Sequence, residues 1–574
     1  ALNNYNIIKW PRSRAAELLA ALALGTFYSW QRMWSLLALS VALRAPILTP
    51  TRPLRTPTPA LAAGTSASVL FVVGDGDSPF GATSPEPSPS WATVAHHLAR
   101  RLPDFDSKIS ASVATADALA GAPAADVVVA LGVGADAAAP LAALSSSSAA
   151  VLTYRCGAAV RALQRVGAYE PEAGGLQEAL TSVAPWAGLA RGKRISEQAD
   201  LLLSRHSSED LLYAVFFAIH GCELLDLAIV RHTVNPTWEK GPVQNAVEFG
   251  KMCTKCGDKI AAALGDPETK ATIDLLNACD MRDQVGSYRV IVSFETPQLE
   301  EFSLCILQQN NCFECSADIL ETPRVPLQRR WNGAALDAAA ARQIFVGHLD
   351  HAEAHASSQK LAHSWKIVCG ANPAYDAFPA QHQIFYPSTK SSTSLWYDPV
   401  FKVETLDGRQ VWTKRHYRCT PREVAADLRG DDGASHGAWT LSTLDNGVIS
   451  KEHWTTVDAA DDLSWAIFHY SGAASVVGQS YLGALLCSAD GRWPEGARSG
   501  AEYERIRAGF ASCGIELWEL YGHGPPGDDA PTSFMWTAEH ARWQEANPPP
   551  LEPIGEQSVQ AWRKSEKERA LQAA

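Results

Sequence analysis

The chain has 574 residues, of which 46% are hydrophobic and 19% charged, and its formal net charge is -13. This composition is typical of a globular protein with hydrophobic cores, and it excludes a wholly disordered or fibrous chain. The negative charge argues against nucleic acid as a partner, because a surface that binds nucleic acid is basic. The length predicts several domains, since a domain commonly has about 150 residues.

Residues 1–65 are interpreted as a leader or targeting segment. The run Met33–Leu43 has the length of the apolar core of a signal peptide and is too short to span a membrane. No Asp or Glu occurs between Leu18 and Gly74, and residues 44–65 are rich in Pro, Thr, Ala and Arg. This pattern is typical of a transit peptide and predicts delivery to a plastid. A plain secretory leader with a disordered linker is the alternative.

Residues 66–208 are predicted to form an α/β domain. A helical pattern over 91–102 alternates with short apolar runs of the buried-strand type at 68–73, 126–132 and 150–154. Strands that alternate with helices indicate a mostly parallel sheet. The turn Gly74-Asp-Gly76 follows the first strand but lacks the third glycine of a dinucleotide fingerprint. We therefore expect a scaffold domain that binds no nucleotide.

Residues 209–330 are predicted to be a helical region that carries cysteines. It begins with an apolar helix at 211–219, which Ser and acidic residues precede as a cap. The disulfide candidates are Cys253, Cys256, Cys279, Cys305, Cys312 and Cys315. Disulfides are favoured if the leader delivers the protein to an oxidising compartment. Free thiols and a zinc site are the alternatives, and the wide spacing of the two Cys-x-x-Cys pairs disfavours zinc.

Residues 331–364 are predicted to be a linker helix with His348, His351 and His355. The last two histidines share one helix face, so a metal pair is geometrically feasible, and clustered histidines can also sense pH. A polar helix between domains is the favoured interpretation, and we expect no metal.

Residues 365–522 are predicted to form an all-β domain, and twelve of the eighteen Trp residues follow residue 330. Eight alternating runs indicate strands at 365–368, 383–385, 395–403, 410–418, 439–443, 453–457, 465–470 and 481–487. Asp407-Gly408 suits a tight hairpin turn. A helix at 501–513 and a strand at 516–521 follow, and residues 523–574 form a charged tail. This order is that of an eight-stranded lipocalin-type antiparallel barrel, which can hold one small apolar ligand.

The cysteine-bearing region and the barrel together resemble the violaxanthin de-epoxidase family, and most closely the violaxanthin de-epoxidase-related proteins of plastids. The resemblance extends from Cys253 to Tyr521. In the barrel it is carried by residues 365–378, 381–385, 444–448, 461–465, 478–484 and 518–521. In the cysteine-bearing region it is carried by residues 253–256, 276–279, 283–284, 301–305 and Cys312.

The resemblance implies an enzyme of the plastid thylakoid lumen or the thylakoid membrane periphery. Such an enzyme uses ascorbate to reduce a xanthophyll epoxide, of the violaxanthin or diadinoxanthin type, when the lumen turns acidic. The implied partners are a xanthophyll or other apolar ligand, the thylakoid membrane surface, and a photosystem or antenna complex. Ascorbate is the implied reductant, and neither a metal nor a nucleotide is expected. The alternative is a non-catalytic lipocalin that binds a carotenoid or lipid as a subunit of a photosynthetic membrane complex.

The resemblance also implies site residues. The family's barrel acid is an Asp, and Glu452 takes its place here; a carboxyl group buried in a barrel suits this role because desolvation raises its pKa. Tyr470 matches a family tyrosine and is the second catalytic candidate. The family's histidine corresponds to Gln383. The alternatives are a solvated carboxylate for Glu452 and a barrel-filling aromatic for Tyr470. The substrate-binding candidates are Asp376, Gln381, Gln383 and Tyr481.

Overall fold

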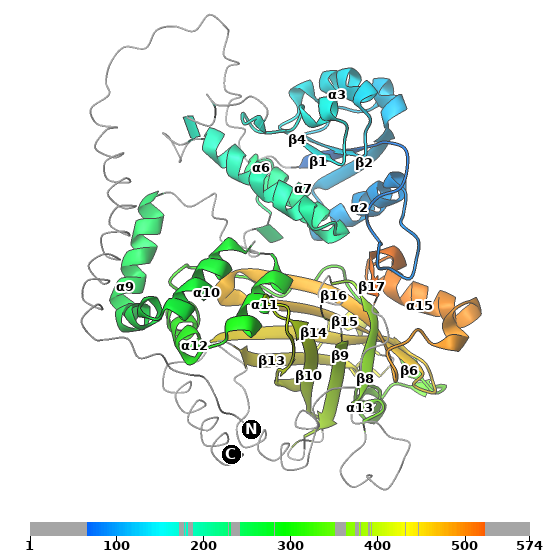
Figure 1. Ribbon diagram of the computed structural model, residues 1–574. Helices are drawn as coiled ribbons and strands as arrows, with labels where there is room; N and C mark the ends of the chain where they lie inside the picture. Colours follow the sequence, from blue (N-terminus) through cyan, green and yellow to red (C-terminus); the bar gives the residue numbers. More distant parts are fainter. Residues whose placement is uncertain are drawn as a thin grey trace, which may run out of the picture.

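The computed structural model describes residues 66–522 except 172–176, 178–179, 182–187, 228, 231–241, 280–281, 350–362, 373–377, 379, 389–390, 392, 431 and 446. The predicted leader and tail, together with His351, His355 and Asp376, therefore lie outside the described residues. An α/β domain lies over one side of a β-barrel, with a helical region beside it (Figure 1). In the described part of the chain, no helix is long and apolar enough to cross a membrane.

The α/β domain is built on a five-stranded sheet of order β2-β1-β3-β4-β5. The first four strands are parallel, and β5 is antiparallel to β4. Their bounds are β1 (Ala67–Val73), β2 (Ile109–Thr115), β3 (Val127–Leu131), β4 (Ala150–Tyr154) and β5 (Arg165–Val166). The predicted α/β fold is confirmed. The sequence did not reveal β2, whose burial is mostly intermediate and which lies at the sheet edge.

Helices cover both faces of this sheet. Phe71 packs into a core with α2 (Trp91–Phe105), α6 (Gly188–Ser204) and α7 (Ser208–Gly221). The adjacent Leu70 faces the other side, where it shares a core with α3 (Ala138–Leu144) and α4 (Ala158–Arg161). Because both faces are buried, the central strands are continuous apolar runs, and this made them recognisable in the sequence.

The helical region follows, with its helices packed against one side of the barrel (Figure 1). It consists of α9 (Pro242–Gly265), α10 (Pro267–Ala278), α11 (Gln284–Phe294), α12 (Pro297–Ser303) and the π-helical turn η5 (Leu304–Gln309). The side chains of Asp266, Asp283 and Thr296 cap α10, α11 and α12 by accepting hydrogen bonds from first-turn amides.

A disulfide joins Cys256 in α9 to Cys305 in η5. Cys253 is an exposed thiol and Cys312 a buried thiol, so the structure does not pair them. The thiols of Cys279 and Cys315 lie near the carbonyl oxygens of Leu275 and Phe313. The structure thus cross-links two of the six cysteines that the sequence offered as disulfide candidates.

Eight antiparallel strands close into a barrel, because β8 pairs with both β9 and β16. They are β8 (Trp365–Gly370), β9 (Ala380–Pro387), β10 (Leu395–Glu404), β12 (Tyr417–Pro421), β13 (Ala438–Asp445), β14 (Val448–Ala459), β15 (Trp465–Ala474) and β16 (Gln479–Ser488). The predicted lipocalin-type barrel is confirmed. The predicted strand 410–418 is wrong as a single strand, because the chain breaks at residues 415–416 into β11 (Gln410–Lys414) and β12.

A helix closes one end of the barrel. Within the segment predicted as a linker, α13 (Ala338–Val346) places Phe345 among the interior rings of Phe385 and Phe468, with centroid separations of 5.0 and 4.7 Å. The indole of Trp365 donates a hydrogen bond of 2.9 Å to the Ile344 carbonyl oxygen at the same end. This part of the linker therefore belongs to the barrel core.

The chain leaves the barrel through α15 (Gly500–Ser512), which packs outside β15, and returns to the α/β domain. The predicted strand 516–521 is wrong over most of its length. The chain instead forms the 3-10 turn η10 (Leu517–Glu519), with the two-residue strand β17 (Tyr521–Gly522) after it. A capping box formed by Glu516 and Glu519 stabilises this turn.

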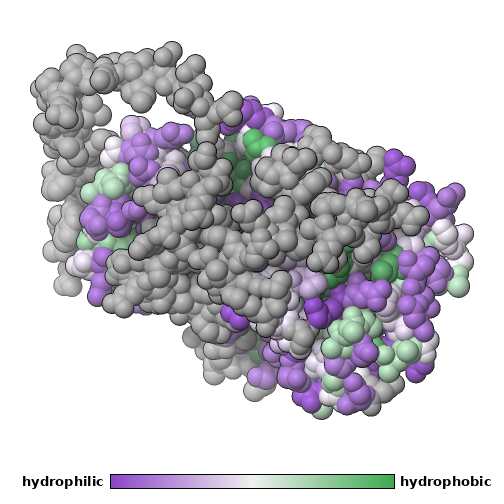
Figure 2. Space-filling view, turned by 90° about the horizontal axis from the view of Figure 1, so that it is seen from below, coloured by the Kyte–Doolittle hydropathy of each residue, from purple (hydrophilic) through white to green (hydrophobic). Residues whose placement is uncertain are grey.

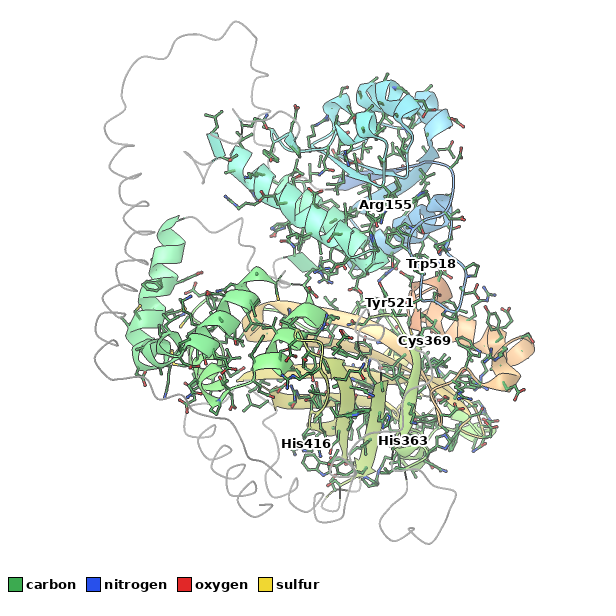
Figure 3. The ribbon with its side chains drawn as sticks, viewed as in Figure 1. Arg155, His363, Cys369, His416, Trp518 and Tyr521 are labelled. Atoms are coloured by element: carbon green, nitrogen blue, oxygen red, sulfur yellow. A yellow bond between two sulfur atoms is a disulfide. The ribbon has the colours of Figure 1, made fainter. Side chains whose placement is uncertain are left out.

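Residues 516–522, called the C-terminal segment below, hold the α/β domain and the barrel together. Trp518 and Tyr521 lie between them (Figure 3), and the Trp518 ring packs 6.4 Å from that of Phe80. The buried carboxylate of Glu519 lies 2.8 Å from His97 Nε2 and 3.7 Å from Arg101. Burial alone would raise the pKa of Glu519, but His97 and Arg101 lower this pKa to about 2.

On the described part of the face seen from below, hydrophobic residues form small patches among hydrophilic ones (Figure 2).

Candidate functional site

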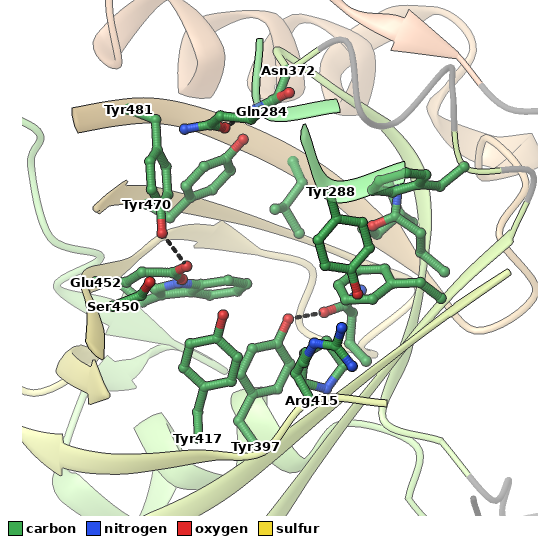
Figure 4. Close-up of a pocket in the computed structure, with 18 of the residues that line it drawn as sticks. Gln284, Tyr288, Asn372, Tyr397, Arg415, Tyr417, Ser450, Glu452, Tyr470 and Tyr481 are labelled. Atoms are coloured by element: carbon green, nitrogen blue, oxygen red, sulfur yellow. Dashed lines mark hydrogen bonds between the residues drawn. The ribbon is translucent and has the colours of Figure 1, made fainter. Parts of the chain in front are cut away.

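The barrel encloses a cavity of about 240 Å³ at the end away from α13, partly covered by α11 (Figure 4). Aromatic rings, hydroxyl groups and amides dominate its wall. The lining residues are Gln284, Tyr288, Ile367, Asn372, Phe378, Gln381, Gln383, Tyr397, Pro399, Phe401, Arg415, Tyr417, Asp445, Ser450, Glu452, Trp454, Tyr470, Tyr481 and Leu485. An apolar-aromatic cavity with a few converging polar groups is the usual form of a small-molecule site.

Glu452 is the carboxyl group at the centre of this wall. Side chains alternate along β14, so Glu452 and Trp454 both point into the barrel. The Glu452 side chain accepts hydrogen bonds of 2.6 Å from the Tyr481 hydroxyl and 2.6 Å from the Trp454 indole. The residue is 8% exposed, and burial raises its pKa although hydrogen bonds from Tyr481, Trp454 and Tyr417 oppose the rise. A carboxyl group with a raised pKa can hold a proton at mildly acidic pH and donate it.

Two tyrosines stand beside Glu452 because glycines on the paired strand leave room for them. A Cβ on Gly483 would lie 2.4 Å from the Tyr470 hydroxyl, and a Cβ on Gly472 would lie 2.4 Å from the Tyr481 ring. Each glycine is the cross-strand partner of the tyrosine that covers it. These positions therefore set where the two hydroxyl groups lie in the cavity.

A second group of hydroxyls, those of Tyr397 and Tyr417, lies below Glu452 in Figure 4. The Tyr397 hydroxyl donates a hydrogen bond to Gln383, and Gln381 is buried nearby on the same strand. Burial, with Glu452 adding to it, raises the pKa of Tyr397 and Tyr417 well above the ordinary tyrosine value. Both phenols are therefore neutral. Tyr397 donates its hydrogen bond to Gln383 and Tyr417 donates its hydrogen bond to Glu452, so each oxygen can accept a hydrogen bond from a ligand hydroxyl.

Helix α11 and the break between β11 and β12 complete the wall at the open end. The Arg415 guanidinium lies 5.2 Å from the centroid of the Tyr288 ring and forms a 2.6 Å ion pair with Asp445. Burial raises the pKa of Tyr288 to about 12, so this hydroxyl is also neutral. The charge of Arg415 is compensated within the wall.

The structure brings five of the predicted catalytic and substrate-binding residues into one cavity: Glu452, Tyr470, Gln381, Gln383 and Tyr481. Asp376, the sixth, lies outside the described residues. Tyr397 and Tyr417 were not among the predicted site residues, although strict alternation from their neighbours would have placed them on the interior face. Tyr288 and Arg415 gave no such signal, because a helix and a strand break position them through tertiary packing.

No group of three or more His, Cys, Asp or Glu residues is placed to hold a metal ion within the described residues. The polar groups of the cavity are instead hydrogen-bond donors and acceptors around one carboxyl group and one compensated ion pair. This arrangement suits the binding of an organic ligand and proton transfer to it.

A closed eight-stranded antiparallel barrel with an internal cavity and a helix packed outside defines a lipocalin domain. Residues 248–515 match the VDE lipocalin domain family. This part of the chain is therefore the lipocalin domain of the violaxanthin de-epoxidase family, which confirms the resemblance found in the sequence.

Two solved structures are similar to part of the chain. Lobster apocrustacyanin A1 is 13% identical, with 37% of this chain and 98% of that chain covered and a TM-score of 0.20. Apocrustacyanin C1 is 12% identical, with 37% and 95% covered and a TM-score of 0.21. No curated protein matches the chain.

Proposed function

We propose that the barrel binds the epoxide-bearing end ring of a xanthophyll and reduces the epoxide with ascorbate as the reductant. The observation that carries this proposal is the buried Glu452 carboxyl group, held by Tyr481 and Trp454 in an aromatic cavity. A carboxyl group exposed to water would give its proton to the solvent. Burial instead favours the neutral acid that can protonate a ligand oxygen.

Ascorbate is the only reductant that this reaction needs. The epoxide oxygen accepts protons and leaves as water, both carbon–oxygen bonds break, and a carbon–carbon double bond forms. This reduction consumes two electrons and two protons. The ascorbate monoanion supplies both electrons and one proton as it becomes dehydroascorbate, and the acidic medium supplies the second proton. Glu452 donates the proton that weakens the first carbon–oxygen bond, and the Tyr481 hydroxyl helps to stabilise the carboxylate that remains.

The dimensions of the cavity limit how the ligand binds. About 240 Å³ is below the range of roughly 300 to 1,000 Å³ that is usual for a site enclosing a whole drug-sized ligand. We therefore expect one end ring to enter beside Glu452 and Tyr470, with the polyene leaving through the open end near α11. The neutral phenols of Tyr397 and Tyr417 are placed to bind a ring hydroxyl.

Incubation of the protein with violaxanthin or diadinoxanthin and ascorbate at about pH 5 tests this function. The wild type should form the de-epoxidised pigment, and Glu452→Gln should lose nearly all turnover while still binding pigment. Glu404→Gln is the matched control, because Glu404 is an exposed carboxylate on β10 and should not affect turnover. Absence of product with the wild type, under conditions in which a known de-epoxidase turns over, would refute catalysis.

Binding without chemistry is the second candidate function. Gln381 and Gln383, which cannot titrate, occupy the wall opposite Glu452, and Asp445 is paired with Arg415. The cavity thus offers one carboxyl group that is not in an ion pair, and the two glutamines opposite it cannot act as a second acid or base. A carotenoid or lipid that is extracted with the native protein, without any turnover, would support this carrier role.

The location of the protein is also a proposal. The leader composition supports a plastid, and an acidic thylakoid lumen would supply the proton that the reaction needs beyond the one from ascorbate. Attachment to the periphery of the thylakoid membrane, or to a photosystem or antenna complex, would bring the protein to its pigment. Fractionation of plastids with an antibody to this chain tests the location, and recovery outside the thylakoid fraction would contradict it.

A further inference from the structure

A second chamber of about 340 Å³ lies where the α/β domain, the segment leading into α11 and the barrel meet. The α/β domain contributes the turn after α6 and the start of α7, including Arg205 and Asp210. Arg282 precedes α11, and Ser480 and Tyr521 come from the barrel and the C-terminal segment. Three parts of the chain that are far apart in sequence therefore build one chamber.

The chamber adjoins the barrel cavity. Gln284, Asn372 and Tyr481 line both spaces, and the Asn372 amide donates a 3.3 Å hydrogen bond to Gln284. These three side chains lie together above Glu452 in Figure 4. Tyr481 also donates the 2.6 Å hydrogen bond to Glu452. A molecule in the chamber would thus contact Tyr481, which is hydrogen-bonded to the buried Glu452.

Most of the residues that line the chamber are polar, and four of its five charged side chains form ion pairs. The fifth, Asp283, caps α11. Arg205 forms a 3.0 Å ion pair with Asp210, and Arg282 lies 3.3 Å from Glu209. Burial raises the pKa of Glu209, although Arg282 opposes the rise. An apolar chain placed here would remove these groups from water without replacing their hydrogen bonds, which is unfavourable. A small hydrophilic molecule would not incur this cost.

We propose that this chamber binds a small molecule with several hydroxyl groups, and that it is the site of the polar co-substrate of the barrel. The α/β domain then contributes part of a binding site and does more than support the barrel. The role of the chamber in turnover rests on the function proposed above. Binding of a small molecule in the chamber can be measured without turnover.

The variant Val285→Trp tests the site, because Val285 lines the chamber and not the barrel cavity. Val292→Trp, on the same helix and lining neither space, is the matched control. Isothermal titration calorimetry of the full chain with sodium ascorbate, and separately with erythritol as an uncharged polyol, gives the affinities. We expect saturable binding of at least one probe, weakened by about tenfold or more in Val285→Trp and unchanged in Val292→Trp.

If neither probe binds the wild type, or if Val285→Trp binds as tightly as the wild type, the chamber is not a polyol site. Equal weakening by both variants would also overturn the proposal, because it would indicate a general disturbance of α11. Xanthophyll titrations of the same three proteins separate this result from the function of the barrel. If the wild type does not bind xanthophyll, the function proposed for the barrel is refuted, independently of the calorimetric result for the chamber.

Discussion

Glu452→Leu is the substitution that most severely tests the hydrogen bonding of the cavity. Leucine removes the acceptor of two buried donors, the Tyr481 hydroxyl and the Trp454 indole. A buried donor without a partner costs about 1 to 3 kcal/mol, so two predict a loss of about 2 to 6 kcal/mol in the free energy of unfolding. Glu452→Gln keeps the shape: its amide oxygen can accept from Trp454, and its amide nitrogen can donate to Tyr481. We expect this variant to change stability by less than about 1 kcal/mol at acidic pH.

The pH dependence of the same comparison tests the raised pKa. A carboxyl group whose pKa is higher in the folded than in the unfolded protein holds its proton more tightly when folded. Its stabilising contribution is fully present below the ordinary value of 4.5 and is lost as pH rises through the folded pKa of Glu452. Glutamine lacks this contribution. The stability of the wild type relative to Glu452→Gln should therefore fall as the pH is raised.

Urea unfolding of the three proteins at several values from about pH 4.5 to about pH 8, with the slope of each transition compared, measures both effects. Titration of all other groups is shared by the wild type and Glu452→Gln, so it cancels in their difference. A difference that does not change with pH, or that grows in favour of the wild type as the pH rises, would refute the claim that burial raises this pKa. If Glu452→Leu is as stable as Glu452→Gln, the two hydrogen bonds do not stabilise the fold.

Three further substitutions test the surroundings of the site. Gly483→Ala should displace Tyr470 and destabilise the protein by about 1 to 3 kcal/mol, measured by urea unfolding, while weakening xanthophyll binding. Cys305→Ser should cost about 4 kcal/mol, because the disulfide closes a loop with a sequence separation of 49 residues. Glu519→Gln should cost about 3 to 5 kcal/mol at neutral pH. The difference from the wild type should disappear as pH falls from the ordinary 4.5 towards 2, since the folded pKa of Glu519 is lowered.

Each of these has a control in the same part of the chain. Gly496→Ala adds a Cβ into open space and should leave pigment binding unchanged. Cys253→Ser removes an exposed thiol and should not alter stability, so an equal loss in both cysteine variants would contradict the disulfide. Glu516→Gln, which removes a partly exposed ion pair with Arg100, should cost at most about 1 kcal/mol. A larger loss of stability in Glu516→Gln than in Glu519→Gln would contradict the role of Glu519 in holding the two domains together.

The parts of the fold that the sequence predicted are those with regular burial. Val127–Leu131 is buried on both faces, and its continuous apolar run predicted a strand at this place. The hairpin at Asp407-Gly408 was predicted from turn chemistry, and Gly408 has the positive φ of 79° that such a turn requires. By contrast, η10 lies where a strand was expected, because Trp518 and Glu519 are buried against another domain and not in a sheet.

The candidate site was predictable where a strand carries it and hidden where packing assembles it. Glu452 was found by resemblance, and the period of two along β14 accounts for its interior position. Tyr288 enters the wall from a helix that is more than a hundred residues away from β14 in the sequence. The polar chamber beside Asp210 and Arg282 depends on how the α/β domain sits on the barrel, and no local pattern encodes that contact.

The most direct test of the central claim is a crystal structure of the Glu452→Gln variant with a bound epoxide xanthophyll. We predict that the epoxide oxygen lies within about 2.6 to 3.2 Å of the residue 452 side chain, with the end ring between Tyr470 and the phenols of Tyr397 and Tyr417. A ligand bound outside the barrel, or an end ring inside it with the epoxide directed away from residue 452, would contradict the account.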